Sequence, residues 1–354
     1  MTNNINISKI SNILKPNIVK KKEYVDIKLL NNITKYRNTI SNIINGKDKR
    51  LLVVVGPCSI HKYDEAIDYA KKLVILQNKY KDRLFIVMRV YFEKPRTTVG
   101  WKGLIYDPYL NNSCAINDGI LLARKLLIAI TSLGLPIGCE FLDVFLPQYY
   151  ADLVSWGAIG ARTTESMIHR QLASGLSMPI GFKNGTTGNI DIAINAIITA
   201  SNPHTFLGID NVGIASRVET NGNKNLHIIL RGSKNSPNYY MKDVNNTINC
   251  LKEKNVNMRL MIDLSHGNSN KKCKNQLVSC DNVCKQLENN NNIIGIMIES
   301  NIFEGNQKLS NNLKYGVSIT DECVDIITTS IMLNKLYNSI KNRFNNVSII
   351  KNNI

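Results

Sequence analysis

The sequence predicts an α/β protein, a (β/α)₈ TIM barrel that carries an N-terminal arm and an inserted β-hairpin. Three observations predict this fold. About eight short apolar runs recur along the chain, helix-compatible segments separate most of them, and a polar or charged residue follows each run. Such alternation favours a parallel sheet covered by helices, and eight units favour a closed barrel over an open sheet. A chain of 354 residues is long enough for one barrel with additional segments.

The chain begins with a polar segment, residues 1–46, in which Ile and Leu are scattered without the pattern of a strand. We expect an N-terminal arm here, with one or two helices, above all over residues 27–44. A continuous apolar run at residues 51–55, followed by Gly56-Pro57, is typical of a strand buried on both faces. The barrel is therefore expected over residues 47–354.

The other barrel strands are expected at further apolar runs of the same kind. In chain order the expected strands are residues 51–55, 84–90, 136–141, 158–161, 179–182, 227–230, 259–262 and 293–298. The helices expected around them are residues 63–80, 116–133, 165–173, 190–200, 241–253 and 270–287.

One stretch, residues 205–225, does not fit this alternation. We expect an inserted β-hairpin there. The sequence Asn221-Gly222-Asn223 is a plausible turn for it, because Asn and Gly adopt the left-handed backbone that tight hairpin turns require.

Chemically active side chains follow the apolar runs at their carboxyl ends. Active sites of α/β barrels are built at these ends, so the side chains are expected in one mouth. Randomly placed surface charge would not fall so regularly. In strand order the residues are Cys58 with His61, Arg89, Glu140, Arg162, Lys183, Arg231, Asp263 with His266, and Glu299.

Cations form one group in this mouth. Several of them converging on one pocket indicate a polyanionic ligand, because the planar fork of Arg gives paired, charge-assisted hydrogen bonds to phosphate and carboxylate. The alternative is that each cation pairs with a carboxylate at the rim, but carboxylates such as Glu140 and Glu299 are too few to neutralise them all. The cations are Arg89, Arg162, Lys183 and Arg231.

Potential metal ligands form the second group. Cys58, His266, Glu299 and a later Asp would make a mixed soft and hard ligand set, which tolerates Mn, Fe or Zn. Each residue alone is weak evidence, because a Cys after a buried strand is usually a small core residue.

The formal charge is +17, from 44 Lys and Arg against 27 Asp and Glu. Such a balance can indicate a nucleic-acid or membrane partner. Here the lysines are scattered, no Arg-rich stripe with interleaved aromatics occurs, and no apolar run reaches the length of a membrane span. We therefore expect no nucleic acid and no membrane as partner, and a positive field that favours anionic substrates.

Eight cysteines occur, and the first twenty residues lack the apolar core of a secretion signal. Reduced thiols and a cytoplasmic location are therefore expected.

Eight segments have the sequence of known enzyme motifs. They are GPCSIH (56–61), MRVYFEKPRTTVGWKGL (88–104), GARTTES (160–166), GFKNGT (181–186), HIILRG (227–232), IDLSHGNS (262–269), MIESNIFEGNQ (297–307) and SITD (318–321). In this collinear order they resemble the signature segments of class I 3-deoxy-D-arabino-heptulosonate 7-phosphate (DAHP) synthases, the feedback-regulated bacterial and yeast type. The resemblance covers nearly all of the chain from about residue 51.

The resemblance implies an enzyme, a transferase that condenses phosphoenolpyruvate with erythrose 4-phosphate to give DAHP and phosphate. This is the first step of the shikimate pathway, which leads to chorismate and the aromatic amino acids. A divalent metal, Mn, Fe or Zn, is implied as cofactor. The nearest alternative is an octulosonate 8-phosphate synthase, whose sugar-site motif resembles KANRS, whereas this chain has Lys94-Pro95-Arg96-Thr97.

The resemblance also implies roles for single residues. The metal ligands would be Cys58, His266, Glu299 and Asp321. The phosphoenolpyruvate phosphate would be held by Arg162, Arg231 and the backbone at Ala161, and its carboxylate by Arg89 and Lys183, with Glu140 in the same pocket. Lys94, Pro95, Arg96 and Thr97 would form the erythrose 4-phosphate site. Catalytic roles would fall to Lys94, His266 and Cys58.

Regulation is implied as well. In regulated members an aromatic amino acid binds beside the hairpin, and the N-terminal arm serves oligomerisation and regulation in a homodimer or homotetramer. A glycine at position 208 favours tyrosine, whereas a serine there would favour phenylalanine; tryptophan or a lost response stays open. The implied effector residues are Pro147, Gln148, Leu176, Ser177, Phe206 and Gly208.

One loop departs from the family pattern LRGGK-x-PNY. Here Arg231-Gly232 is followed by Ser233, and one residue is added before Pro237. If the replaced glycine needs a positive φ, Ser233 would add strain.

Overall fold

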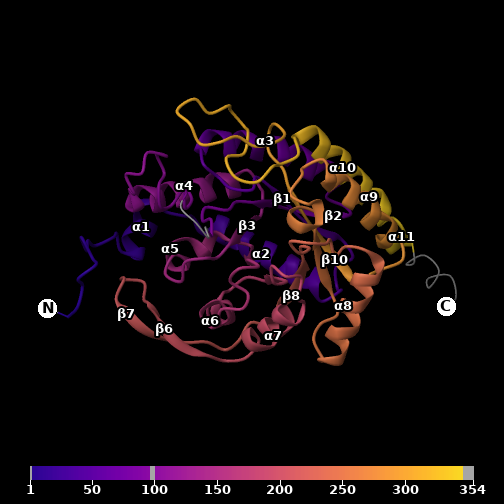
Figure 1. The fold of residues 1–354 in the computed structure, drawn as a ribbon, viewed down its shortest axis with the longest axis horizontal. Helices are drawn as coiled ribbons and strands as arrows, with labels where there is room; N and C mark the ends of the chain where they lie inside the picture. The colour runs from indigo at the N-terminus through magenta and orange to yellow at the C-terminus, as the bar shows by residue number, and fades with distance from the viewer. Residues whose placement is uncertain (1, 96–99, 346–354) are drawn as a thin grey trace.

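Eight parallel strands close into a barrel (Figure 1). The computed structural model describes residues 2–95 and 100–345. Around the barrel the strand order is β1-β10-β9-β8-β5-β4-β3-β2. The strands are β1 Leu51–Gly56, β2 Leu84–Arg89, β3 Ile137–Glu140, β4 Trp156–Ile159, β5 Ile180–Lys183, β8 Leu226–Leu230, β9 Leu260–Asp263 and β10 Ile293–Glu299. The predicted fold class is confirmed, with every expected strand present.

Every residue of these eight strands is buried, which explains their continuous apolar runs. Because side chains alternate along a strand, each apolar run contributes side chains both to the barrel interior and to the layer between strands and helices. Leu52 and Val54 of β1 point into the barrel and pack with Val87 of β2. Val53 and Val55 belong to the layer between strands and helices.

Helices surround the barrel and complete that outer layer (Figure 1). They are α3 Tyr63–Tyr80, α4 Ile116–Ser132, α5 Pro147–Tyr150, α6 Met167–Gly175, α7 Asp191–Ala200, α8 Met241–Glu253, α9 Asn275–Leu287, α10 Ile326–Ser339 and α11 Asn342–Asn345, with 3₁₀ turns η1 Ala151–Leu153 and η2 His266–Ser269. The expected helix over residues 270–287 begins only at Asn275, because η2 and a turn occupy the preceding residues. No helix within residues 2–95 and 100–345 is long and apolar enough to cross a membrane.

The N-terminal arm consists of two differently packed parts. Helix α2 (Ile27–Ile44) begins at Asp26, whose carboxylate accepts a hydrogen bond from the Leu29 amide at 2.7 Å. Its last turns bury Ile40, Ile43 and Ile44 in the same cluster as the inward-facing strand residues. The Ile44 carbonyl also accepts from Asn257, which precedes β9, so α2 closes the amino-terminal end of the barrel. Helix α1 (Pro16–Lys22) lies outside, against α4 and α5.

The inserted hairpin consists of β6 (Thr205–Ile209) and β7 (Ala215–Glu219), paired antiparallel with Gly208 opposite Ser216. Its tip touches the arm, since the Asn17 amide donates to the Asn211 carbonyl at 2.9 Å (Figure 1). The expectation of a turn at Asn221-Gly222-Asn223 is wrong. The chain reverses at residues 210–214, where the Asp210 carboxylate accepts from two backbone amides.

Candidate active site

A cavity of about 400 Å³ opens at the carboxyl ends of the strands. It brings together most of the predicted site residues, as the strand ends require. Arg96 and Thr97 lie outside the described residues. The predicted residues that line the cavity are Cys58, Arg89, Lys94, Pro95, Glu140, Ala161, Arg162, Lys183, Arg231, His266 and Asp321.

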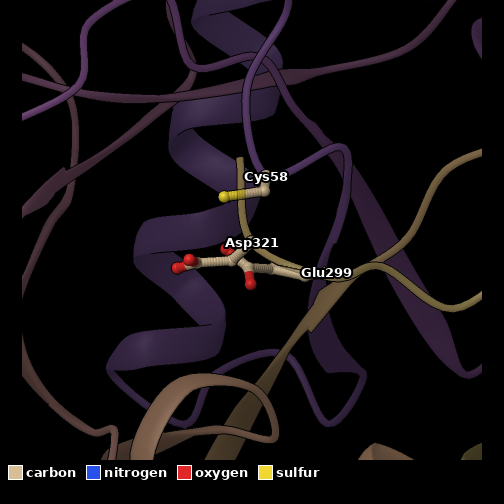
Figure 2. Close-up of side chains that lie close together, drawn as sticks. All are labelled: Cys58, Glu299 and Asp321. Carbon is tan, nitrogen blue, oxygen red and sulfur yellow. The ribbon is translucent and has the colours of Figure 1, made fainter. Parts of the chain in front are cut away.

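Three side chains could hold a metal ion: Cys58 and Asp321, which line the cavity, and the buried Glu299 next to them. The Cys58 thiol and one carboxylate oxygen each of Glu299 and Asp321 all lie within 4.8 Å of one another (Figure 2). Burial raises the pKa of the Cys58 thiol and the Glu299 carboxylate adds to this, so metal binding here would displace a proton. One sulfur and two oxygens suit the borderline metals Mn, Fe and Zn.

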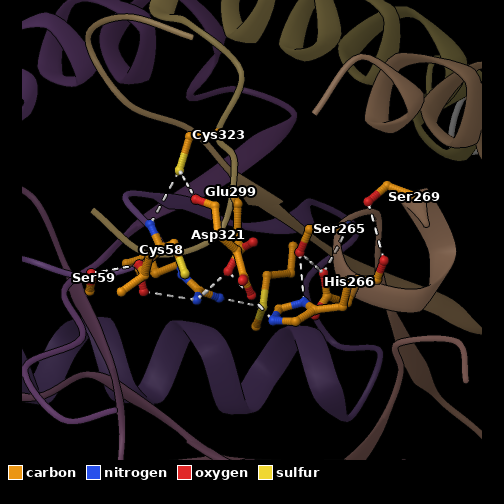
Figure 3. Close-up of polar contacts among 12 residues, drawn as sticks. Cys58, Ser59, Ser265, His266, Ser269, Glu299, Asp321 and Cys323 are labelled. Atoms are coloured by element: carbon orange, nitrogen blue, oxygen red, sulfur yellow. Dashed lines mark hydrogen bonds and ion pairs between the residues drawn. The ribbon is translucent and has the colours of Figure 1, made fainter. Parts of the chain in front are cut away.

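His266 lies beside this cluster and contacts it through Glu299. Its Nε2 is 3.5 Å from Glu299 Oε1, while its Nδ1 is 2.9 Å from Asp263 Oδ2 and 2.7 Å from Ser265 Oγ (Figure 3). The backbone of His266 is left-handed, with φ of 55°. A ring nitrogen held by a carboxylate is the usual arrangement of a metal-binding His, because the partner fixes the tautomer and orients the ring.

Glu299, at the end of β10, is paired with Arg89, at the end of β2, and strand β1 lies between these two strands. Arg89 Nη2 donates to Glu299 Oε1 at 2.7 Å, and both side chains are buried. Burial acts to raise the pKa of Glu299, but the charges of His266 and Arg89 outweigh it and hold this pKa at about 2. The Arg89 guanidinium also lies over the Tyr91 ring at 3.9 Å. Arg89 therefore stays charged and fixed in direction.

Asp263, at the end of β9, links the metal cluster to the cations. Its Oδ2 lies 3.0 Å from Lys183 Nζ as well as 2.9 Å from His266 Nδ1. Sequence reasoning placed Asp263 at a strand end but gave it no role. The position of Asp263 at the end of a buried strand could have indicated a role, because a fully buried carboxylate needs cationic partners.

The cations divide into a paired and an unpaired set. Arg89 and Lys183 each have a carboxylate partner, as the rim-pairing alternative holds. Arg162 and Arg231 take part in no ion pair among residues 2–95 and 100–345. Burial lowers the pKa of Arg231, and the nearby Arg162 charge acts in the same direction. A bound anion would offset both the burial of the Arg231 charge and its repulsion by Arg162.

Lys94 reaches the floor of the cavity from the loop after β2. Its Nζ donates to Cys58 Sγ at 3.1 Å, and its backbone amide donates to the Lys102 carbonyl at 3.0 Å. Pro95 follows, and its carbonyl accepts from Arg162 Nη1 at 3.3 Å. The loop that carries Lys94 is thereby joined to the phosphate-binding candidate Arg162.

Glu93 fixes the loop after β2, which carries Lys94, to the buried residues beneath it. This buried carboxylate accepts from the Tyr150 hydroxyl at 3.0 Å and from the Asp143 amide at 2.8 Å. Burial raises the pKa of Glu93 to about 8, and the Asp143 carboxylate contributes in the same direction.

Two glycines let the cavity form. A Cβ on Gly160 would lie 2.3 Å from Glu140 Oε1, so a side chain there would push that carboxylate out of its present position. A Cβ on Gly232 would lie 2.5 Å from the Gly267 carbonyl carbon. The loops after β8 and β9 therefore pack backbone to backbone.

The departing loop 231–236 is unstrained at Ser233. The left-handed residue there is Gly232, with φ of 73°, and Ser233 is not among the residues with positive φ, so the condition for strain at Ser233 is not met. The Ser233 hydroxyl accepts from the Asn235 and Ser236 amides at 3.1 and 2.9 Å. This local turn accommodates the added residue.

The predicted effector residues lie on three elements away from the cavity. Pro147 and Gln148 begin α5, Leu176 and Ser177 follow α6, and Phe206 and Gly208 are on β6. The end of the hairpin is joined to α6, since Ser174 Oγ lies 2.7 Å from Thr220 Oγ1. Helix α5 meets the arm, since the Tyr149 hydroxyl donates to the Leu14 carbonyl.

Further residues of the cavity lining were missed by sequence reasoning. They follow the strand ends by several residues, in loops whose conformation no strand pattern predicts. They include Thr186, Lys234, Asn270, Lys271 and Thr320.

Comparisons with known proteins agree with this geometry. The model of the DAHP synthetase I family matches residues 19–334. The chain is 50% identical over 342 residues to the Phe-sensitive phospho-2-dehydro-3-deoxyheptonate aldolase of Escherichia coli K12, covering 96% of this chain and 97% of that protein. It is 46% identical over 342 residues to the Tyr-sensitive aldolase of the same strain, covering 96% of each. The structure of the Francisella tularensis SCHU S4 aldolase aligns with a TM-score of 0.94 and 47% identity, covering 96% of this chain and 99% of that one. With a family model over most of its length and relatives near half identity, the chain belongs to the DAHP synthetase I family.

Proposed function

We propose that this protein is a metal-dependent DAHP synthase, which condenses phosphoenolpyruvate with erythrose 4-phosphate and releases phosphate. One observation carries the proposal. Cys58 and Asp321, which with the adjacent Glu299 could hold a metal ion, line the same cavity as cations that lack carboxylate partners among the described residues. This combination suits an aldehyde and two phosphate esters, which need an electrophile-activating group and counter-charges in one place.

Phosphoenolpyruvate would lie across the cations. Its phosphate, which carries about two negative charges, fits the unpaired Arg162 and Arg231. Its carboxylate fits Arg89 and Lys183, whose directions are fixed by Glu299 and Asp263. Partners already held in place lose little entropy when the substrate binds, which favours a defined orientation of the reacting carbon.

Lys94 is the proposed proton donor of the condensation. As C3 of phosphoenolpyruvate forms its bond to the aldehyde carbon, the aldehyde oxygen becomes an alkoxide that needs a proton. Lys94 Nζ lies 3.1 Å from Cys58 Sγ, next to the metal cluster, and can supply it. A divalent Mn, Fe or Zn ion bound there would polarise the aldehyde as a Lewis acid. Water then adds at C2, and the C–O bond to phosphate breaks.

The second substrate would be held by the Lys94-Pro95-Arg96-Thr97 segment. Pro95 lines the cavity, and Arg162 donates to its carbonyl. Arg96 and Thr97 are proposed to bind the erythrose 4-phosphate phosphate, on the resemblance alone. The contact between Arg162 and Pro95 would let the two phosphate sites adjust to each other.

A coupled assay tests the proposal. Purified protein with Mn²⁺ should release one phosphate and form one DAHP for each phosphoenolpyruvate consumed, with erythrose 4-phosphate preferred over five-carbon sugar phosphates. Preference for a five-carbon sugar phosphate would instead favour an octulosonate-type enzyme. Exhaustive chelation should abolish turnover and Mn²⁺ should restore it. Full activity of the metal-free protein would refute the ligand assignment.

Feedback inhibition, with tyrosine as effector, is the proposed regulation. The support is Gly208, whose lack of a side chain leaves room for a hydroxyl group. Both Phe- and Tyr-sensitive proteins are similar to this chain over nearly its full length, so overall identity does not choose between them. The effector would contact Phe206 on the hairpin, Pro147 and Gln148 on α5, and residues 176–177.

The proposed assembly is a homodimer or homotetramer in the cytoplasm. All eight cysteines are free thiols, which suits a reducing compartment. Exposed apolar residues gather in the arm and hairpin, among them Ile7, Ile10 and Leu207, and a second copy would cover them. Size-exclusion chromatography with light scattering would measure the state.

A further inference from the structure

Two lysines at the rim of the cavity have no role in the chemistry proposed so far. Lys234 and Lys271 both line the cavity and both are exposed. Among residues 2–95 and 100–345, neither forms an ion pair. This sets them apart from Lys183 deeper in the same cavity, which is buried and paired with Asp263.

The backbone at Lys271 is in an unfavourable conformation. Its φ is 59°, and the preceding Asn270 has φ of 52°. Asn tolerates the left-handed region, whereas Lys is rarely found there because its Cβ meets the backbone. The turn is held by the Lys271 amide, which donates to the His266 carbonyl at 2.8 Å; the same carbonyl accepts from Ser269 Oγ (Figure 3). Strain of this kind persists at a cavity where the side chain it directs has a use.

The two lysines are on neighbouring loops. Lys234 lies three residues beyond Arg231, in the loop after β8, and its amide donates to the Thr186 carbonyl at 3.2 Å. Lys271 lies in the loop after β9. The two loops pack at Gly232 and Gly267, and the Gly267 amide donates to the Arg231 carbonyl at 3.0 Å. Both lysines thus lie on loops that border the side of the mouth occupied by Arg231.

We propose that Lys234 and Lys271 form a capture rim, which binds the phosphate of the incoming substrate before it reaches Arg231 and so selects dianionic phosphate esters. The inference rests on the proposed function of the cavity. An exposed ammonium on a flexible side chain can bind a hydrated phosphate at the entrance. Arg231 is partly buried, its Nε has no hydrogen-bond partner among the described residues, and it can bind the phosphate deeper in the cavity. Charges of one sign around an opening raise the association rate of an oppositely charged ligand.

Lys271→Met tests the rim, because Met keeps an unbranched side chain and the backbone demand while removing the charge. The matched control is Lys272→Met, since the adjacent Lys272 is equally exposed and does not line the cavity. Inorganic phosphate and phosphoenolpyruvate would be titrated by calorimetry into the full-length protein with Mn²⁺. Lys271→Met should weaken both by about 3- to 10-fold, and Lys234→Met similarly, while Lys272→Met binds as the parent does.

Kinetics provides the second measurement. The rim variants should lower kcat/KM for phosphoenolpyruvate with little change in kcat, and should flatten its dependence on salt. Equal effects of Lys271→Met and Lys272→Met, or unchanged phosphate binding in the Lys234→Met, Lys271→Met double variant, would overturn the rim. Calorimetry needs no turnover. An inactive parent whose phosphate binding still depends on Lys271 would therefore refute the proposed function and leave the rim standing.

A stability comparison checks the argument from strain. Glycine accepts a φ of 59° without cost, whereas alanine does not. Lys271→Gly should therefore unfold at a higher urea concentration than Lys271→Ala, although both lose the charge. If alanine were as stable as glycine there, the backbone would not be strained at this residue and that part of the argument would fail.

Discussion

The barrel mouth and the inserted hairpin each contain an ion pair of the same length in opposite surroundings. In the mouth, Lys183 Nζ lies 3.0 Å from Asp263 Oδ2, and the side chains are 3% and 0% exposed. On β7, Arg217 Nη2 lies 3.0 Å from Glu219 Oε1, and the side chains are 75% and 62% exposed. The distance between charges therefore does not tell what the pair contributes.

The difference lies in water. An exposed pair is screened and contributes about 0–1 kcal/mol. A buried charge that loses its partner costs about 3–5 kcal/mol, because no water replaces it. The buried ion pairs of the mouth thus depend on both partners for their stability. The exposed charges of the hairpin can be substituted with little loss of stability. We expect substitutions in the mouth to alter chemistry or stability, and substitutions in the hairpin to alter regulation alone.

Loss of the metal site should have the largest effect. Cys58→Ala removes the sulfur from the cluster with Glu299 and Asp321. Lewis-acid activation contributes several kcal/mol, so turnover should fall roughly a thousandfold or more. Bound metal would be measured by atomic spectroscopy and the fold by circular dichroism. Cys250→Ala on α8 is the control and should keep both metal and activity; a fully active Cys58→Ala would remove the thiol from the site.

The two ion pairs can be compared directly. Asp263→Asn leaves Lys183 as a buried charge without a full partner, and should lower the free energy of unfolding by about 3–5 kcal/mol. Glu219→Gln should change it by about 0.5 kcal/mol or less. Urea unfolding of both variants with the parent measures the contrast. Similar losses in the two variants would show that burial does not set the value of these pairs.

Arg162 and Arg217 give the same comparison for activity. Arg162→Ala removes an unpaired cation from the cavity and should lower kcat/KM for phosphoenolpyruvate. The fall should correspond to a loss of about 2–4 kcal/mol of transition-state stabilisation. Arg217→Ala on the hairpin should leave uninhibited turnover unchanged. Steady-state kinetics with each substrate varied decides. If Arg162→Ala impaired use of erythrose 4-phosphate equally, the proposed division into two phosphate sites would be wrong.

Glu93 should make stability depend on pH. Its pKa is raised by burial to about 8 in the folded protein, so the folded state binds the proton more tightly than the unfolded state. Its stabilising effect is present below about pH 4.5 and is lost as the pH rises through 8. Between pH 6 and 9 the loss should be about 1–3 kcal/mol.

Glu93→Gln should flatten this part of the profile, since the amide cannot ionise beside Asp143, Tyr150 and Cys139. Glu288→Gln, at the exposed end of α9, is the control and should follow the parent. Thermal melts at pH 6, 7, 8 and 9 provide the measurement. Parallel profiles for parent and Glu93→Gln would show that this carboxylate titrates outside the range.

The barrel could be predicted because its strands are buried on both faces and leave continuous apolar runs. The first and last residues of the strands were predicted less accurately than the strands themselves. Strand β4 was expected at residues 158–161 and is Trp156–Ile159, because Ala-Ile-Gly-Ala is apolar on both sides of the strand end. The helix at residues 27–44 was expected within a polar arm, but the sequence does not tell what its apolar side chains cover. Only the structure shows Ile40 and Ile44 closing the barrel.

Within the site, residues at strand ends were predictable and residues in loops were not. The left-handed turn that presents Lys271 arises from backbone hydrogen bonds around His266, which leave no pattern in the sequence. The hairpin shows the opposite error. Asn221-Gly222 has the composition of a turn, yet Asn223 is buried and its amide donates to the Leu176 and Met178 carbonyls. The tertiary contacts of Asn223 therefore override the local turn signal.

The smallest expected effect belongs to the hairpin and concerns only the effector. Gly208→Ser should shift inhibition from tyrosine toward phenylalanine, because the added side chain fills the space proposed for the tyrosine hydroxyl. Its Cβ would meet Val218 Cγ2 at 2.8 Å, and that methyl group can rotate away, so the hairpin should stay folded and uninhibited turnover unchanged. The coupling at stake is about 1–3 kcal/mol. Rates would be measured against tyrosine, phenylalanine and tryptophan, with Thr205→Ser as control, since Thr205 is exposed on the other face of β6. If no aromatic amino acid changed the parent's rate or melting temperature at millimolar concentration, the hairpin would have no regulatory role of this kind, and its contrast with the mouth would be one of stability alone.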